Sequence, residues 1–103
     1  MAQKLTAADF AAAISGDKLA LVDFYTDSCV PCKRLAPVLG DLEDEHGSLV
    51  AVYKVNAMQE EALSDQYEVM STPTLVLFKG GKELDRKVGV QTKDVLAGWI
   101  QSF

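Results

Sequence analysis

The amino-acid sequence predicts one α/β domain in which helices cover both faces of a central mixed sheet of about five strands. Short apolar segments that favour strands alternate with amphipathic segments that favour helices, and two strand-like segments near the C-terminus are joined by Gly80 and Gly81. The chain has 103 residues, of which 49% are hydrophobic. This is enough for one core and too little for two, so we expect a single domain over residues 1–103 with about four helices.

The predicted elements are separated by glycine, proline or polar residues. In chain order we expect a helix over 6–16, a strand over 19–25, a helix from the cysteines to Gly47, a strand over 48–56, a helix over 59–67, a hairpin over 72–89 and a helix over 92–103.

Each predicted helix has apolar residues at helical spacing. Thr6 and Thr92 are candidate N-caps of the first and last helices, and Gly16 and Gly47 end the first and the second. The residues expected to face inward are Phe10, Ala13 and Ile14; Leu35, Val38, Leu39 and Leu42; Ala62, Leu63, Gln66 and Tyr67; and Val95, Leu96, Trp99, Ile100 and Phe103.

The charge of the chain disfavours nucleic acid as a partner. Fifteen acidic and ten basic residues give a net charge of -5, and no basic cluster is longer than a pair. No segment approaches the roughly 20 apolar residues of a membrane span, and the N-terminus lacks the apolar run of a signal peptide. We therefore expect a soluble, cytoplasmic protein that binds neither nucleic acid nor membrane.

The only two cysteines, Cys29 and Cys32, lie in VDFYTDSCVPCKRLAPVL, where a predicted strand gives way to a helix. A structural disulfide closing so short a loop would remove little entropy from the unfolded chain. A structural zinc site typically needs about four ligands, and the chain offers no second cysteine pair and one distant histidine. We therefore interpret the pair as a working dithiol and expect no metal within a single chain.

The position of the two cysteines indicates different roles. Pro31 favours the first turn of a helix, so Cys29 lies at a helix N-terminus, where the unpaired N–H groups and the dipole stabilise a thiolate. Cys32 follows one helical turn later, within reach of Cys29. We expect Cys29 to attack a substrate disulfide and Cys32 to resolve the mixed disulfide.

Two predicted buried strands each carry a single charge. Asp23 lies in LALVDFY, six residues before Cys29, and Lys54 lies in the strand over 48–56. Burial would raise the pKa of Asp23 and suit it to exchange a proton with the Cys32 thiol, with Lys54 as its candidate partner. The alternatives are a carboxylate that is merely hydrogen-bonded at a strand end and a solvated lysine.

With these residues placed, the sequence resembles the thioredoxin family over nearly its whole length. The segments VDFY, CVPCK, APVL, YKVN, TPTLVLFKGG and KVG occur in the order and at the spacing of that family. A CxxC pair alone is a weak signal, whereas this combination is specific. The resemblance implies the thioredoxin fold and a protein-disulfide reductase.

The resemblance also implies a substrate-docking surface beside Cys29. In the family, Thr72-Pro73 would be a cis peptide facing the cysteines, the Thr72 backbone would pair with an extended substrate segment, and Gly89 would complete the surface. The candidate substrate-binding residues are Val30, Pro31, Thr72, Pro73 and Gly89.

Cofactors and partners follow from the same resemblance. The redox group would be the chain's own disulfide, without a further cofactor, and it would be re-reduced by a flavoenzyme of the thioredoxin reductase type. The substrates would be protein disulfides, and we expect a monomer. The alternatives are a module dedicated to one binding or redox-regulatory partner and, within the same fold, glutaredoxin-type chemistry.

The sequence departs from the family pattern next to the cysteines. Val30 replaces the glycine of the usual Cys-Gly-Pro-Cys motif, Ser28 replaces the preceding tryptophan, and Tyr25 stands where another tryptophan is frequent. A β-branched Val30 restricts the backbone and adds apolar bulk next to Cys29. We hypothesise that it alters partner choice and the reduction potential.

Overall fold

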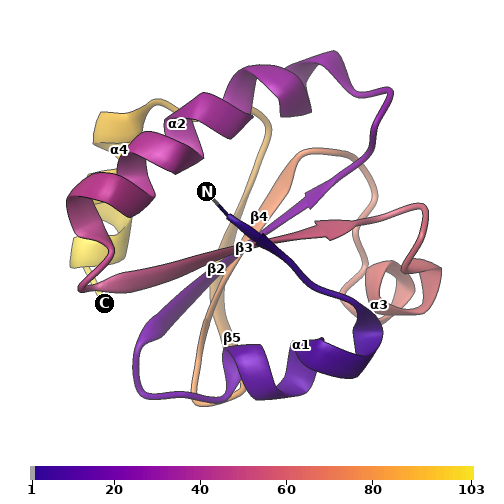
Figure 1. The fold of residues 1–103 in the computed structure, drawn as a ribbon, viewed down its shortest axis with the longest axis horizontal. Coiled ribbons are helices and arrows are strands. Elements are labelled where there is room, and N and C mark those ends of the chain that lie inside the picture. The colour runs from indigo at the N-terminus through magenta and orange to yellow at the C-terminus, as the bar shows by residue number, and fades with distance from the viewer. Residues whose placement is uncertain (1) are drawn as a thin grey trace.

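A computed structural model describes residues 2–103 and contains five strands and four helices in that range. In chain order these are β1 (Gln3–Lys4), α1 (Ala7–Ile14), β2 (Leu19–Tyr25), α2 (Val30–His46), β3 (Val50–Asn56), α3 (Glu61–Gln66), β4 (Thr74–Lys79), β5 (Lys82–Val88) and α4 (Lys93–Gln101). The strands form one sheet in the order β1-β3-β2-β4-β5 (Figure 1). The predicted mixed sheet with helices on both faces is confirmed.

Strand β2 is the centre of the sheet. It pairs in parallel with β3 and antiparallel with β4, and all of its residues except the half-buried Tyr25 are buried. In the parallel register Asp23 stands opposite Lys54, and in the antiparallel register it stands opposite Leu75. The sheet itself therefore places the charges of the two buried strands beside each other.

The predicted hairpin joins β4 to β5. Gly80 and Gly81 have φ values of +60° and +81°, a left-handed conformation that glycine adopts without steric cost. The Gly81 N–H donates a hydrogen bond to the carbonyl of Ile14, the last residue of α1, and the Gly80 N–H donates one to the carbonyl of Gly16, two residues later. The turn is thus held against the first helix.

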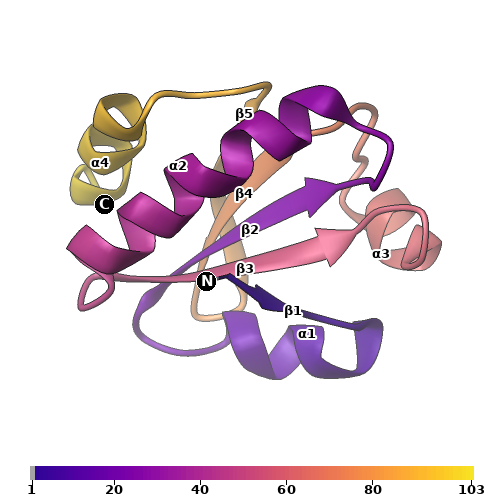
Figure 2. The same ribbon diagram turned by 45° about the horizontal axis from the view of Figure 1, so that its top comes forward.

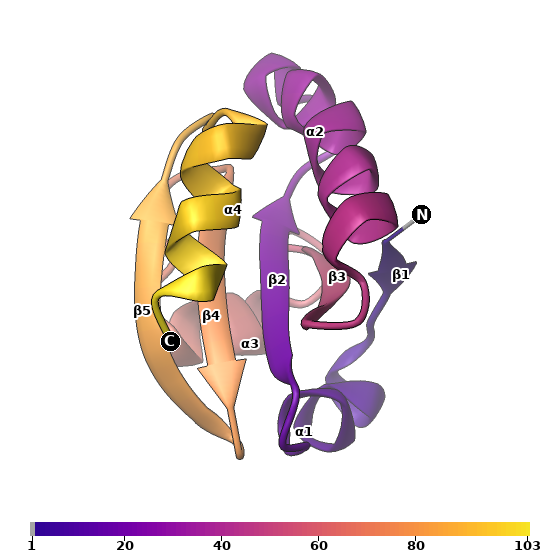
Figure 3. The same ribbon diagram turned by 90° about the vertical axis from the view of Figure 1, so that its left-hand side faces the viewer.

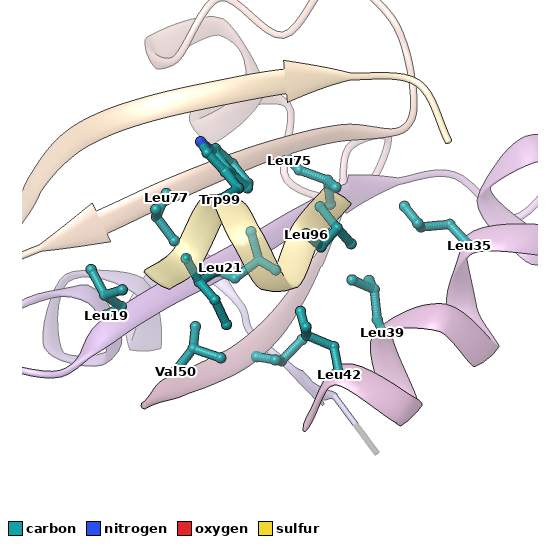
Figure 4. Packing of buried hydrophobic residues seen from close by; sticks show 12 residues of the cluster. Leu19, Leu21, Leu35, Leu39, Leu42, Val50, Leu75, Leu77, Leu96 and Trp99 are labelled. Carbon is teal, nitrogen blue, oxygen red and sulfur yellow. The ribbon is translucent and has the colours of Figure 1, made fainter. Parts of the chain in front are cut away.

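Two apolar clusters fill the faces of the sheet. Helices α2 and α4 cover one face, and α1 and α3 cover the other (Figures 1 and 3). Figure 4 shows the first cluster, in which leucines of α2 meet Leu96 and Trp99 of α4 and the side chains of the strands. The second cluster has an aromatic centre formed by Phe10, Phe24 and Phe78 with the half-buried Tyr67.

The prediction of which helix residues face inward is wrong at four positions, in α3 and in or near α4. Val95 and Phe103 are 46% and 49% exposed, because α4 ends at Gln101 and turns only Leu96, Trp99 and Ile100 toward the sheet. In the short α3, Ala62 and Gln66 are exposed, and Leu63 is its buried apolar residue. The edge strand β1 was not predicted. None of the helices in residues 2–103 is long and apolar enough to cross a membrane.

Candidate active site

The cysteine pair lies at the N-terminus of α2, just after the loop that connects it to the central strand β2. Cys29 is the N-cap of α2, in an extended conformation, and Pro31 occupies the first turn, where a missing N–H is tolerated. Cys29 and Cys32 form a disulfide with their Cα atoms 5.2 Å apart. Within residues 2–103 no group of three or more His, Cys, Asp or Glu side chains is arranged to hold a metal ion.

The surroundings of the two sulfurs differ. The Cys32 side chain belongs to the core, with 4% of the residue exposed, whereas Cys29 is partly exposed. The backbone N–H of Cys32 donates a hydrogen bond of 3.1 Å to the Cys29 Sγ atom. In the reduced protein this donor and the helix N-terminus would stabilise negative charge on Cys29. Cys29 is therefore the more exposed of the two cysteines, and it is the one whose sulfur accepts the backbone hydrogen bond.

Asp23 lies behind the pair as a buried carboxyl group. Only 4% of the residue is exposed, and its Oδ1 atom has no hydrogen-bond partner. Burial raises the pKa of Asp23 to about 7, and the positive charge of Lys54 opposes this increase without cancelling it. The carboxyl group can thus gain or lose a proton near neutral pH.

Lys54 is half-buried and lines a hollow together with Asp23. Its Nζ atom lies 5.6 Å from the centre of the Tyr25 ring, a cation–π distance. A hollow of about 170 Å³ connects these groups; it is lined by Asp23, Tyr25, Thr26, Asp27, Cys32, Lys33, Ala36 and Lys54. We call this space the front hollow. It brings Asp23, Lys54 and Cys32 together.

The loop before β4 lies against the cysteines. The Thr72-Pro73 peptide is cis, as the family resemblance implied, and the Thr72 carbonyl oxygen lies 3.6 Å from the Cys29 Sγ atom. The Thr74 hydroxyl donates a 2.6 Å hydrogen bond to the Ser71 carbonyl and so holds the loop at its base.

Gly89 is tied to the same loop. Its N–H donates a 2.9 Å hydrogen bond to the Pro73 carbonyl, and its φ of +92° is one that residues with a side chain rarely adopt. Val30 projects from the first turn of α2 with 63% of the residue exposed. Apolar bulk next to the disulfide is therefore available for contact with another molecule.

Sequence reasoning missed two features of the site. Asn56, at the end of β3, donates a 3.3 Å hydrogen bond to the Asp27 carboxylate and so links β3 to the loop before Cys29. Gly40, inside α2, lines a second hollow that also reaches Asp23. A glycine within a helical pattern was the one available signal, because glycine weakens a helix unless another constraint favours it.

Comparison with known proteins identifies the family. Residues 1–102 match the family model described as Thioredoxin. The chain belongs to the thioredoxin family. It is 44% identical over 92 residues to the thioredoxin of Alicyclobacillus acidocaldarius, covering 89% of this chain and 88% of that protein. It is 53% identical over 78 residues to the thioredoxin of Chlamydia caviae, covering 76% of each.

Solved structures agree with this assignment. A mutant thioredoxin from Halobacterium salinarum superposes with a TM-score of 0.91 at 33% identity, covering 98% of this chain and 88% of that one. The thioredoxin of Malassezia sympodialis superposes with a TM-score of 0.90 at 29% identity, covering 99% of this chain and 90% of that one. The thioredoxin fold expected from the sequence is confirmed.

Family membership and the disulfide together establish the activity. The protein is a thiol-disulfide oxidoreductase of the thioredoxin family that reduces disulfides in other proteins. Its redox group is the Cys29–Cys32 disulfide of the chain itself, so it needs no further cofactor, and a reductase returns this disulfide to the dithiol. The dedicated-partner alternative is not favoured.

Proposed function

We propose that Cys29 is the attacking thiolate and Cys32 the resolving thiol of the reaction. Cys29 attacks one sulfur of a substrate disulfide, forming a mixed disulfide and releasing the first substrate thiolate. Cys32 then attacks the Cys29 sulfur, closing the protein disulfide and releasing the second thiolate. The observation that carries this assignment is the 3.1 Å hydrogen bond from the Cys32 N–H to the Cys29 Sγ atom, which favours negative charge on Cys29.

Asp23 accepts the proton that Cys32 must lose before it attacks. A buried thiol is a poor nucleophile until it is deprotonated, and a carboxyl group with a pKa near 7 takes up a proton readily at neutral pH. Lys54 favours the ionised carboxylate and thereby limits the rise in the pKa of Asp23. Both residues line the front hollow with Cys32, which supports their joint role.

The residues around Cys29 position the substrate. The backbone of Thr72, whose carbonyl oxygen lies 3.6 Å from the Cys29 Sγ atom, pairs with an extended segment of the substrate chain. Gly89, bonded to the Pro73 carbonyl, places no side chain beside the docking segment, and Val30 with Pro31 provides apolar contact. A segment docked in this way places its disulfide sulfur against Cys29.

The electron donor is a flavoenzyme of the thioredoxin reductase type, and the protein works as a monomer in the cytoplasm. The chain acts as one domain over residues 1–103. The continuous sheet, with one cluster on each face, supports the single domain. The net charge of -5 supports a monomer, because it opposes association of two copies.

Reduction of insulin disulfides by dithiothreitol, followed as turbidity, tests these assignments. The intact protein should accelerate precipitation, while Cys29→Ser and Cys32→Ser should each abolish the acceleration. Cys32→Ser should also accumulate a mixed disulfide through Cys29, detectable by mass spectrometry. Trapping on Cys29→Ser instead would reverse the two roles, and no acceleration by the intact protein would favour a module dedicated to one partner.

A further inference from the structure

Two hollows border Asp23. Besides the front hollow, a second hollow of about 90 Å³ borders this residue, and we call it the rear hollow because it is lined by residues of α2 farther from the cysteines. It is lined by Ala2, Asp23, Ala36, Leu39, Gly40 and Lys54. Asp23, Ala36 and Lys54 line both hollows, so the two spaces meet at the buried carboxyl group.

Small residues keep the rear hollow open. Gly40 has no side chain, and a Cβ atom built on it would meet no neighbouring atom within 4 Å. Ala36, one helical turn earlier, contributes only a methyl group. Ala2 lines the hollow from the segment before β1 and packs against the cluster that contains the leucines of α2. Figure 2 shows β1 at the edge of the sheet, next to β3. A larger side chain at position 40 would have room to enter this space.

The carboxyl group at the end of the hollow lacks a protein partner. Asp23 is 4% exposed, and its Oδ1 atom is buried without a hydrogen bond. A buried polar atom without a partner is costly unless water reaches it. A volume of about 90 Å³ is several times what a water molecule requires, and Asp23 and Lys54 both offer it polar contacts.

The groups that face Asp23 are few. Lys54 approaches from β3, and Leu75 of β4 stands opposite in the register and is apolar. The remaining charged or titratable groups, Tyr25, Asp27, Cys32 and Lys33, line the front hollow only. Cys32, the partner of Cys29 in the disulfide, lines the front hollow, so the front hollow is the one nearer to a docked substrate. The rear hollow is bordered instead by Leu39 and Gly40, about two helical turns farther along α2.

We propose that Gly40 is a positioning residue that keeps a solvent path to Asp23 open behind the active site, so that the carboxyl group exchanges its proton with water while a protein substrate covers the front. The proposal rests on the proton-accepting role of Asp23 given above. Cys32 transfers its proton to the Asp23 carboxylate, and the Cys32 thiolate displaces the substrate thiolate from Cys29. The neutral Asp23 then releases the proton to water in the rear hollow, which restores the carboxylate.

The test compares Gly40→Leu with a matched control on another helix, Gly98→Leu. Gly98 is exposed in α4, and a Cβ atom there would also meet no neighbour within 4 Å. Filling the rear hollow should raise the pKa of Asp23 by about half a unit or more, measured from the carboxyl carbon by NMR titration, because the ionised group loses its water. Gly98→Leu should leave this pKa unchanged.

Turnover separates the solvent path from a general loss of structure. At pH 9, where Asp23 stays ionised in both proteins, Gly40→Leu should slow reduction of insulin by about threefold or more, with little effect on a small aromatic disulfide that leaves the front hollow open. Gly40→Ala, which favours the helix, should fold well and give a smaller effect of the same sign. An unchanged pKa of Asp23 in a folded Gly40→Leu protein, or equal slowing with both substrates, would overturn the proposal.

A second comparison distinguishes failure of this proposal from failure of the proposed role of Asp23. If Asp23→Asn reduces insulin as fast as the unaltered protein, Asp23 is not the proton acceptor and both proposals fail. If Asp23→Asn reduces insulin slowly, adding Gly40→Leu to it should not lower the rate further, because no carboxyl group remains that could exchange a proton through the rear hollow. A further loss in the double variant would show that position 40 acts by another route.

Discussion

Asp23 is the residue whose chemistry depends most on its position in the fold. Its carboxyl group is surrounded by the central strands and by α2, and burial raises its pKa from 3.8 to about 7. Because the pKa of Asp23 differs between the folded and the unfolded protein, the free energy of unfolding must depend on pH. Between these two pH values the folded protein holds a proton that the unfolded chain has released, so raising the pH favours unfolding.

The replacement Asp23→Asn should remove this dependence. The stabilising effect of the bound proton is fully present below pH 3.8 and is lost as the pH rises through about 7. At about 1.4 kcal/mol per unit of pKa, the loss amounts to about 4 kcal/mol at most. The free energy of unfolding of the oxidised protein, measured in urea between pH 5 and 9, should fall with rising pH, whereas Asp23→Asn should be more stable than the unaltered protein at pH 9. Asp17→Asn, an exposed control, should retain the decline, and parallel curves for Asp23→Asn would contradict the prediction.

Val30 should influence both docking and redox chemistry, and two variants separate these effects. Val30→Ala removes apolar bulk but retains a restricted backbone, so the KM for insulin should rise by up to about tenfold, since full burial of a valine contributes about 1.5 kcal/mol. Val30→Gly also frees the backbone between the cysteines and should in addition shift the reduction potential. Equilibration with a glutathione buffer measures the potential. An unchanged potential and unchanged kinetics with the reductase in Val30→Gly would refute the hypothesis.

Local sequence predicted the residues of the site that depend on neighbours along the chain. Cys29, Cys32 and Asp23 lie on one strand-to-helix segment, so spacing alone brought them together. Thr72 is 43 residues from Cys29, and only the family resemblance placed its backbone beside the sulfur. Gly40 escaped notice because its contribution is the absence of a side chain, which matters only once α2 lies over Asp23.

Helices α1 and α4 both have a threonine as their N-cap residue, but the two threonines differ in their hydrogen bonds. The Thr92 hydroxyl oxygen accepts a 3.2 Å hydrogen bond from the Val95 N–H, as an N-cap should. The Thr6 side chain makes no cap bond, and its hydroxyl instead donates to the Asp9 carboxylate at 3.0 Å. The sequence predicted both as N-caps, because the competition from Asp9 is a matter of side-chain rotamer.

Alanine replacements should distinguish the two threonines. Thr92→Ala should lower the free energy of unfolding by about 1 kcal/mol, because a backbone N–H at the start of α4 loses its acceptor. Thr6→Ala should cost less than half of that, since only an exposed bond between side chains is removed. Urea denaturation of the two variants side by side gives the comparison. Equal losses would mean that the cap bond of Thr92 adds nothing.

Elements were predictable where the pattern was strong and local. The strand over 19–25 coincides with β2, and the Gly80-Gly81 pair located the hairpin, because turn geometry fixes its residues. The two-residue β1 has no hydrophobic pattern, and its existence depends on pairing with β3. Phe103 was misassigned because periodicity does not show where the last helix stops contacting the sheet.

The whole molecule should unfold as one unit although the sheet divides its core. Residues of β4 point alternately to the two sides, so that Leu75 and Leu77 belong to the cluster under α2 and α4, while Val76 and Phe78 belong to the other. Because β4 contributes side chains to both clusters, it cannot unfold on one face of the sheet and stay folded on the other. A substitution that destabilises either cluster should therefore lower the stability of both faces equally.

Phe10→Ala tests this coupling, because Phe10 packs against Phe24, Tyr67 and Phe78 on one face and the single tryptophan, Trp99, reports from the other. Removing the ring should cost about 3–5 kcal/mol. The urea midpoint followed by Trp99 fluorescence should fall as far as the midpoint followed by far-ultraviolet circular dichroism, since a cooperative unit has one transition. Phe103→Ala, which removes a half-exposed ring, should shift both midpoints little. A Trp99 transition that stays in place while the circular dichroism transition moves would mean that the two faces unfold separately.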